Sequence, residues 1–518
     1  MALITNHGYL DNPTFRGMRQ HLMQTFDEIY ILDLHGNSKK KEICPNSSSD
    51  QNIFDIQQGV AISIFVKHPE TSKELATVYH ADLWGKRESY QDTPQGKELI
   101  GGKYHWLAEN NVSSTEWETL EPQSPFYLFE PQDTKLLPEY QQGWKVNEIM
   151  PVNSAGVKTH RDHFAIDIDR DRLYKRIEEM RKENISDREY AEKYNTMNSK
   201  NWKLNEARKA ICSDEEWQSK LIYYLYRPFD RRFCYYSPIV MDRPRRELLN
   251  HVAGRKNVCL CLGRQGIAVN DPVWSLISVS SEPVDTNVFR RGGSNVFPLY
   301  LYPTEQTSLF DTNEPTNAPG NRRPNLAPEF IQDFSTRLGM EFMADGKGDR
   351  ENNFAPEDIF DYMYAVFHSP TYRSRYAEFL KIDFPRLPLT SNPDLFRRLT
   401  QLGSRLVKLH LMEETGVEIA TFPESGNNTV EKIRYSEPQR RVWINKTQYF
   451  EGVPREVWKF HVGGYQVCEK WLKDRKGRQL QYDDLSHYQN IVSSLSETIS
   501  IMEQIDEEIE ERGGFPIQ

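Results

Sequence analysis

The hydrophobic pattern near the N-terminus predicts strand, helix, strand, loop and strand, in that order. Residues 2–6 (ALITN), 29–34 (IYILDL) and 60–66 (VAISIFV) are short apolar runs rich in strand-forming residues. Between residues 15 and 26, apolar side chains recur at helical spacing. The segment 36–52 is polar and contains glycine, proline and a serine run, which is typical of a loop. This succession favours the second half of a doubly wound, Rossmann-like α/β domain.

Beyond residue 66 the pattern alternates between β-rich and helical stretches. Residues 76–150 are rich in Trp, Tyr, Glu and Pro, and we expect a short strand at 125–130 (PFYLFE). We also expect β segments at 218–310 and 417–470, helices within 167–217 and 356–412, a loop at 304–325, and a long C-terminal helix at 485–511. The overall prediction is a mixed α+β chain.

Motifs that would bind a nucleotide or a methyl donor are missing from the sequence. A doubly wound domain of that kind has a glycine-rich turn after its first strand. No GxGxxG, GxxxxGK[ST], HExxH or GxSxG occurs, and the pairs Gly101-Gly102 and Gly292-Gly293 lack the required spacing. We therefore expect no catalytic residues of these classes in the chain.

Composition indicates a globular protein of several domains. The chain has 518 residues, of which 38% are hydrophobic, 27% charged and 12% aromatic. No apolar run approaches the ~20 residues that span a bilayer, and the N-terminus does not resemble a signal peptide. The six cysteines contain no CxxC pair, which favours a reducing compartment. We expect an intracellular, cytoplasmic protein.

The net charge of −10 argues at first against nucleic-acid binding, but the charge is unevenly distributed. Residues 225–264 contain nine basic and three acidic residues with interleaved Tyr and Phe, and residues 371–408 contain eight basic and three acidic residues. Arginine dominates both segments, and its planar fork suits phosphate and the guanine edge. The alternative is that these arginines pair with nearby carboxylates or stack on tyrosines as structure.

Several short motifs that could suggest a functional site have a simpler structural interpretation. Asn12-Pro13 is better explained as the start of a helix than as a base-binding NPPF motif. Cys259 and Cys261 fit buried free thiols, and no metal site is expected. Asp167 and Asp169 are not followed closely by the lysine that a nuclease site would have. The acidic run after Pro356 fits the first turn of a helix. The lone His35 after a strand fits a structural role.

Phrases along nearly the whole chain resemble the C-terminal third of Type ISP restriction-modification enzymes, which are single-polypeptide ATP-dependent systems. They extend from residue 4 to residue 478 and are ITNHGYLDNPTFRGMRQHL, IYILDLHGNSKKKE, NIFDIQQGVAISIFVK, GVKTHRD, YRPFDRR, FPLYLY, HSPTYRSRY, FPRLPLT and GGYQVCEKWLKDRKGR. The resemblance implies that residues 1–140 are the distal part of an N6-adenine methyltransferase domain. It also implies that residues 141–518 form a target-recognition domain ending in the helix 485–511.

The resemblance implies sequence-specific recognition of double-stranded DNA within a restriction-modification system of the bacterial or archaeal cytoplasm. S-adenosyl-L-methionine is the cofactor that the family implies, but its binding motif and the catalytic NPPY are absent here. We therefore expect this chain alone to be inactive as an adenine-specific methyltransferase. A separate chain carrying the N-terminal methyltransferase half is a possible partner. The alternative function is a non-DNA-binding assembly subunit, or a decayed fragment, that complements a separate catalytic chain.

Candidate DNA-binding residues are those whose type and setting suit phosphate or base contacts. They are Lys158, Thr159, Arg161, Arg227, Arg231, Arg232, Arg243, Arg245, Arg246, Arg264, Tyr372, Arg373, Arg375, Lys473, Arg475 and Arg478. GVKTHRD presents the first three after a glycine turn, and Gly463-Gly464 would allow close approach of the backbone. Phe15 and Phe54 are candidates for lining a pocket for a flipped base.

Overall fold

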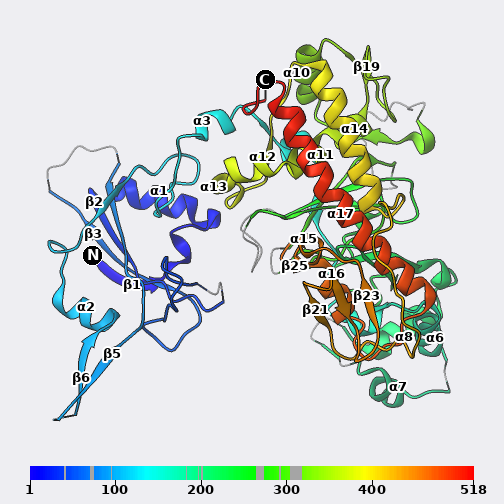
Figure 1. Cartoon of the computed structure of the whole chain (residues 1–518), viewed down its shortest axis with the longest axis horizontal. Coiled ribbons are helices and arrows are strands. Elements are labelled where there is room, and N and C mark those ends of the chain that lie inside the picture. The colour runs from blue at the N-terminus through cyan, green and yellow to red at the C-terminus, as the bar shows by residue number, and fades with distance from the viewer. Residues whose placement is uncertain are drawn as a thin grey trace. The chain divides into compact units, whose positions relative to one another are not determined.

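The chain divides into two units (Figure 1). Each unit has its own hydrophobic core. Unit 1 comprises Met1–Lys135 and unit 2 comprises Leu136–Gln518. The structure is a computed structural model, and it describes residues 1–39, 42–69, 75–94, 96–182, 184–196, 198–199, 202–263, 273–290, 293–303 and 318–517. No helix among these residues is long and apolar enough to cross a membrane.

Unit 1 is built on a five-stranded mixed sheet of order β1-β3-β2-β4-β7. Its elements are β1 (Ala2–Asn6), η1 (His7–Tyr9), η2 (Pro13–Phe15), α1 (Arg16–Thr25), β2 (Glu28–Asp33), β3 (Val60–Val66), β4 (Thr77–Asp82), β5 (Ser89–Thr93), β6 (Gly96–Gly101), α2 (Lys103–Glu109) and β7 (Glu118–Leu120). Strands β1 and β2 are each antiparallel to β3, and β2 is parallel to β4. Strands β1, β2 and β4 therefore run in the same direction, and their carboxyl ends meet at one edge of the sheet.

The predicted helix start at Asn12-Pro13 is confirmed. The Asn12 side chain accepts a hydrogen bond from Thr14 N at 2.9 Å, and Pro13 occupies the first position of η2, which continues into α1. Asn is favoured at this cap and Pro at the first turn, because the proline lacks an N–H that would need a partner there.

The predicted strand at 125–130 is wrong, because this segment folds as a turn. Tyr127 has a φ of +50° and its N–H donates to Gln123 O at 2.8 Å. The fully buried guanidinium of Arg19 donates to the carbonyls of Phe126 (2.7 Å) and Tyr127 (2.9 Å). Backbone groups that a neighbouring strand would have paired are thus satisfied by a side chain distant in sequence.

Unit 2 combines helices with several small sheets. Its helices are α3 (Leu137–Tyr140), α4 (Val146–Ile149), α5 (Asp162–Ala165), α6 (Arg170–Met180), α7 (Asp187–Tyr194), α8 (Leu204–Cys212), α9 (Arg246–Leu249), α10 (Pro328–Leu338), α11 (Pro356–His368), α12 (Pro370–Arg375), α13 (Ala377–Leu380), α14 (Pro393–His410), α15 (Arg455–Trp458), α16 (Val467–Lys473) and α17 (Tyr482–Glu510). The mixed α+β architecture and the long C-terminal helix are confirmed. The helix start at Pro356 is also confirmed.

Among the described residues of unit 2, the strands form three sheets of three or four strands together with shorter pairs. They are β8 (Trp144–Lys145), β9 (Ser154–Ala155), β10 (Ile166–Asp167), β11 (Leu221–Arg227), β12 (Asp230–Tyr235), β13 (Cys259–Leu262), β14 (Ile277–Ser280), β15 (Asn295–Pro298), β16 (Tyr300–Leu301), β17 (Arg323–Pro324), β18 (Glu341–Phe342), β19 (Asn353–Phe354), β20 (Arg386–Leu387), β21 (Arg434–Ser436), β22 (Arg441–Trp443), β23 (Tyr449–Glu451), β24 (His461–Val462) and β25 (Tyr465–Gln466). The larger sheets have the orders β14-β13-β15-β9, β10-β12-β11 and β21-β22-β23.

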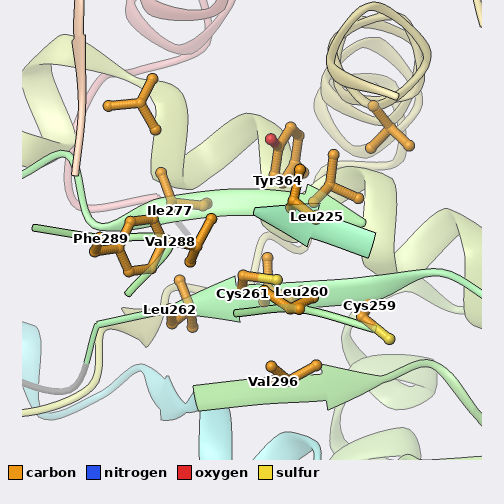
Figure 2. Close-up of a cluster of buried hydrophobic side chains, with 14 of the residues drawn as sticks. Leu225, Cys259, Leu260, Cys261, Leu262, Ile277, Val288, Phe289, Val296 and Tyr364 are labelled. Carbon is orange, nitrogen blue, oxygen red and sulfur yellow. The ribbon is translucent and has the colours of Figure 1, made fainter. Parts of the chain in front are cut away.

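Strand β13 lies at the centre of the unit 2 core (Figure 2). It pairs with β14 on one side and β15 on the other, and all four of its residues are buried. Cys259 and Cys261 are free thiols, as predicted, and burial raises the pKa of both. A buried thiol with a raised pKa is unreactive, which is consistent with a packing role for both residues.

Helices α11, α14 and α17 pack against one another in unit 2. Asn392 caps α14 by accepting from Asp394 N at 2.9 Å, and Pro393 follows as its first residue. At the α11–α14 contact Gly403 lies against the backbone of Asp361, where an added Cβ would be 1.8 Å from the carbonyl oxygen. Glycine at this position therefore permits the close approach of the two helices.

Candidate nucleic-acid interface

Two segments that the sequence analysis identified separately lie side by side in unit 2. Lys158 N donates to Arg243 O at 3.1 Å, and Arg243 N donates to Lys158 O at 2.9 Å. The first segment is also attached to residues 284–286. Val157 N donates to Val284 O at 2.8 Å, and Gly156 is packed against the backbone of residues 284–286. The GVKTHRD loop and the Arg-rich turn at 242–246 therefore form one surface feature.

We call this feature the basic ridge and define it as Lys158, His160, Arg243, Arg245 and Arg246. His160, Arg243 and Arg246 are exposed, and Lys158 and Arg245 are half-buried. His160 has a φ of +53° and Arg245 a φ of +55°. Both residues therefore have a left-handed backbone conformation, which is uncommon for residues other than glycine. The structure thus brings together four of the predicted residues and adds His160.

Local carboxylates neutralise the ridge incompletely. Asp242 lies 3.2 Å from His160 Nδ1 and 3.7 Å from Arg243 Nε. Within the described ranges, Lys158, Arg245 and Arg246 form no ion pair. The ridge therefore offers cationic groups to an anionic partner. Sequence reasoning did not identify His160, although it lies between Thr159 and Arg161 in the same motif.

A second group of candidate arginines forms a buried ion network. Asp230 Oδ2 accepts from Arg232 at 2.6 Å, Asp230 Oδ1 accepts from Arg475 at 2.9 Å, and Arg232 also bonds Asp474 at 2.9 Å. Burial alone would raise the pKa of Asp230, but Arg475 and Arg232 lower it to about 2. This network joins strand β12 to the segment that directly follows helix α16. The alternative given for these arginines, pairing with carboxylates inside the protein, is therefore what the structure shows for Arg232 and Arg475.

Arg227 takes part in a separate buried ion pair. It pairs with Asp285 at 3.1 Å, and its guanidinium lies 3.8 Å from the ring centre of Tyr226. Arg232 stacks on the same ring at 3.9 Å. Exposed Arg231 pairs with Glu282. The Arg/Tyr-rich stretch of β11 and β12 thus holds the unit together through ion pairs and stacking.

The candidates on α12 are held inside unit 2. Tyr372 is fully buried and donates to Arg386 O at 2.6 Å, and the buried Arg373 donates to Phe367 O at 2.7 Å. Arg375 forms a two-pronged pair with Glu139, with both contacts at 2.7 Å. None of these three presents an unpaired cation at the surface in this fold.

The remaining candidates are placed as follows. Arg161 is buried, donates to Val240 O at 3.0 Å and lies over Trp202 at 4.4 Å. Thr159 is buried and bonds Asp162, Arg478 bonds Asp484 at 3.2 Å, and exposed Lys473 pairs with Glu469 at 2.8 Å. Arg264 lies outside the described residues.

Gly463 and Gly464 approach another part of the same chain. A Cβ at Gly463 would lie 2.1 Å from the Phe289 ring, and Gly463 N donates to Ser275 O at 3.0 Å. Both glycines have positive φ values, 57° and 78°. The turn therefore does allow a close backbone approach, and the groups that it approaches are Phe289 and Ser275 of unit 2.

A cleft of about 600 Å³ lies in unit 1 beside the turn after β2. Phe54 lines it and is 41% exposed, next to polar residues such as Asn52, Asp55 and Arg87. Phe15 is 40% exposed on η2 and is not among the described residues that line this cleft. The two predicted pocket residues are therefore not brought together there.

Comparison with protein families matches residues 148–504 to the model described as the Type ISP C-terminal specificity domain. The chain belongs to this family, because the match covers more than half of its length. Comparison with curated proteins gives no significant match.

The solved structures that share the fold include three complexes with DNA or a DNA mimic. The ATP-dependent Type ISP restriction-modification enzyme LlaBIII bound to DNA has a TM-score of 0.66 at 19% identity, covering 100% of this chain and 33% of that one. A nuclease-deletion mutant of the Type ISP enzyme LlaGI in complex with a DNA substrate mimic has a TM-score of 0.63 at 20% identity, covering 100% and 46%. A DrdV–DNA complex has a TM-score of 0.66 at 19% identity, covering 97% and 50%. The chain thus spans a third to a half of these proteins.

Proposed function

We propose that this chain recognises a specific sequence in double-stranded DNA, as the specificity part of an adenine-N6 methyltransferase or restriction-modification system. The observation that carries the proposal is the match of residues 148–504 to a Type ISP specificity domain. The shared fold with three proteins whose structures contain DNA or a DNA mimic supports it. The exposed basic ridge supplies the charge that such a partner requires.

The basic ridge is the proposed contact surface. Its exposed arginines can bind phosphates and, in the major groove, the O6/N7 edge of guanine. Lys158 acts as a point charge toward phosphate. The buried network around Asp230 is assigned no DNA contact, because its guanidinium groups are already used by carboxylates.

The test compares duplex binding by the wild-type chain with binding by an Arg243→Gln/Arg246→Gln variant. A random duplex pool first selects the preferred sequence, and fluorescence anisotropy then measures Kd against salt concentration. We expect at least tenfold weaker binding by the variant and a smaller salt slope, by about one for each lost phosphate contact. Arg188→Gln is the matched control, because Arg188 is an exposed arginine of α7 that pairs with Glu192 at 2.9 Å.

Two outcomes would contradict this proposal. Equal loss of affinity in the Arg188→Gln control would show nonspecific charge attraction at a different surface. Absence of duplex binding even at low salt would favour the alternative, an assembly subunit without DNA contact.

We also propose that a separate polypeptide completes the sheet of unit 1. Strand β1 is an edge strand, and Met1 and Phe65 exchange backbone hydrogen bonds at 2.8 and 2.7 Å. Pairing alternates in an antiparallel ladder, so the backbone groups of Ala2 and Ile4 point away from β3. Ile4 is 46% exposed. An unpaired apolar edge is suited to receive another strand.

The partner is tested by co-expressing this chain with the frame encoded next to it and measuring co-elution. We expect a complex that Ile4→Pro disrupts, because proline removes an N–H from the edge. Ile4→Thr, which keeps that N–H, serves as control. Co-elution that is equal for both variants would exclude β1 as the docking edge.

S-adenosyl-L-methionine does not fit the residues present in unit 1. The segment after β1 folds into η1 and η2, and it contains the single glycine Gly8 where a donor site would need a glycine-rich turn. We therefore assign methyl-donor binding to the completing polypeptide and expect no methyl transfer by this chain alone.

A further inference from the structure

Two histidines and a glutamate meet near the carboxyl ends of strands β1 and β2 in unit 1. His7 follows β1, His35 lies just after β2, and Glu42 belongs to the segment between β2 and β3. One donor atom of each side chain lies within 4.8 Å of the donor atoms of the other two. The carboxyl ends of strands that run in the same direction are where α/β sheets place ligand-binding side chains.

His7 is held by a carboxylate on one side of its ring. Its Nδ1 lies 3.1 Å from both carboxylate oxygens of Asp33. A carboxylate only accepts hydrogen bonds, so Nδ1 carries the proton and, in the neutral ring, Nε2 carries the lone pair. Glu42 Oε1 lies 3.9 Å from this Nε2. A carboxylate behind an imidazole is the usual support of a metal-ligating histidine.

The surroundings of His7 fix the position of its ring. His7 is 4% exposed, and a Cβ at Gly59 would lie 2.3 Å from its Cε1, so glycine at position 59 leaves space for the ring. Asn37 Nδ2 donates to His7 Nε2 at 3.2 Å, and Asn37 N donates to Glu42 Oε2 at 2.7 Å. A bound ion would take the place of the Asn37 amide at Nε2, while Glu42 Oε2 keeps its bond to the backbone.

His35 is oriented by Asp82 and Trp84. Its Nε2 lies 2.8 Å from Asp82 Oδ1, and Trp84 stacks on the ring with centroids 3.3 Å apart. Its Nδ1 lies 3.6 Å from Asp33 Oδ2, which is beyond hydrogen-bond distance. The contact with Asp82 therefore leaves Nδ1 as the ring nitrogen that can bind an ion.

Glu42 connects the group with solvent. Its side chain is 17% exposed, and it lines the cleft of about 600 Å³ together with Gly36 and Asn37. Donor atoms of a tetrahedral ion with bonds of ~2.0–2.2 Å lie about 3.3 Å apart. The 3.9 Å between Glu42 Oε1 and His7 Nε2 closes to this value by a small rotation of the Glu42 side chain.

We propose that His7, His35 and Glu42 bind a divalent transition-metal ion. Two imidazole nitrogens and one carboxylate oxygen suit Zn²⁺ or Co²⁺ and leave a position for water from the cleft. The neighbouring group of Asp33, His35 and Asp82 suits an ion less well, because Asp33 already accepts from His7 and from His35 N. The site lies in unit 1, outside the family match, so it does not rest on the proposed DNA recognition.

The test is titration of the tag-free, EDTA-treated chain with Zn²⁺ by calorimetry and with Co²⁺ by visible absorption. We expect one ion per chain and at least tenfold weaker binding by Glu42→Gln, which keeps an oxygen that can accept from Asn37 N. Glu88→Gln is the matched control and should bind as the wild type does, because Glu88 lines the same cleft and belongs to neither group of possible ligands among the described residues. Circular dichroism checks the fold of each variant, and His35→Gln, with the same expected loss, decides if Glu42→Gln does not fold.

Three results would overturn the proposal. The first is the absence of stoichiometric Zn²⁺ or Co²⁺ binding by the wild-type chain. The second is a folded Glu42→Gln variant whose affinity is unchanged or falls no further than that of Glu88→Gln. The third is a larger loss in Asp82→Asn than in Glu42→Gln, which would assign the ion to Asp33, His35 and Asp82.

Discussion

At Arg475 the guanidinium is buried and bonds Asp230 at 2.9 Å, whereas Arg246 on the basic ridge is exposed. The two residues looked equivalent as candidates for DNA contact. Their surroundings give them different roles, because a buried charge must be paired within the protein and an exposed one can serve a partner.

Replacing Arg475 should therefore affect stability. Arg475→Met leaves the Asp230 carboxylate buried with one partner fewer, and we expect the free energy of unfolding to fall by about 3–5 kcal/mol. Urea unfolding followed by circular dichroism measures the change. Arg246→Met is the comparison and should change stability by no more than about 0.5 kcal/mol. Equal effects would contradict the division into buried and exposed arginines.

Asp361 on α11 should make stability depend on pH. Burial raises its pKa to about 6 although Lys347 acts to lower it. A carboxyl with a raised folded-state pKa stabilises the fold below its ordinary pKa and loses that contribution as pH rises through the folded-state value. Relative to Asp361→Asn, the wild-type chain should lose about 2.4 kcal/mol of its free energy of unfolding between pH 4 and pH 7. Chemical unfolding at each pH measures this, with Asp394→Asn as the exposed control. A constant difference would refute it.

At the scale of elements, the close approach of α11 and α14 depends on a single residue. Gly403→Ala would place a Cβ 1.8 Å from the Asp361 carbonyl oxygen, so the helices must separate. We expect a loss of about 2–3 kcal/mol in the free energy of unfolding.

Gly17→Ala in α1 is the matched control for that prediction. Nothing lies within 4 Å of a Cβ at Gly17, so this change should stabilise the chain by about 0.5–1 kcal/mol. Thermal unfolding of both variants measures the two effects. Equal destabilisation by Gly403→Ala and Gly17→Ala would contradict a specific role of Gly403 in the contact between α11 and α14.

At the scale of the whole molecule, the two units have separate cores and the basic ridge lies within unit 2. We predict that a chain beginning at Leu136 folds alone and binds duplex DNA with the salt slope of the full chain. Circular dichroism and anisotropy titrations check this. An unfolded or aggregated product, or a changed salt slope, would show that unit 1 is required.

Local sequence determined the elements that short-range chemistry controls. The strands β1 and β3, the helix start at Asn12-Pro13 and the long helix α17 were predicted because apolar periodicity and capping act within a few residues. The strand predicted at 125–130 is wrong, because backbone carbonyls of this segment are bound by Arg19, a residue more than one hundred positions away.

Tertiary structure decided which candidates can meet a partner. The sequence showed where arginines are concentrated and which family the chain resembles. It did not show whether the Arg475 side chain faces Asp230 or solvent. The fold also joined residues 156–162 to 242–246, and it brought His35 to Asp82. Burial and pairing arise from contacts between distant segments, and only the folded chain establishes them.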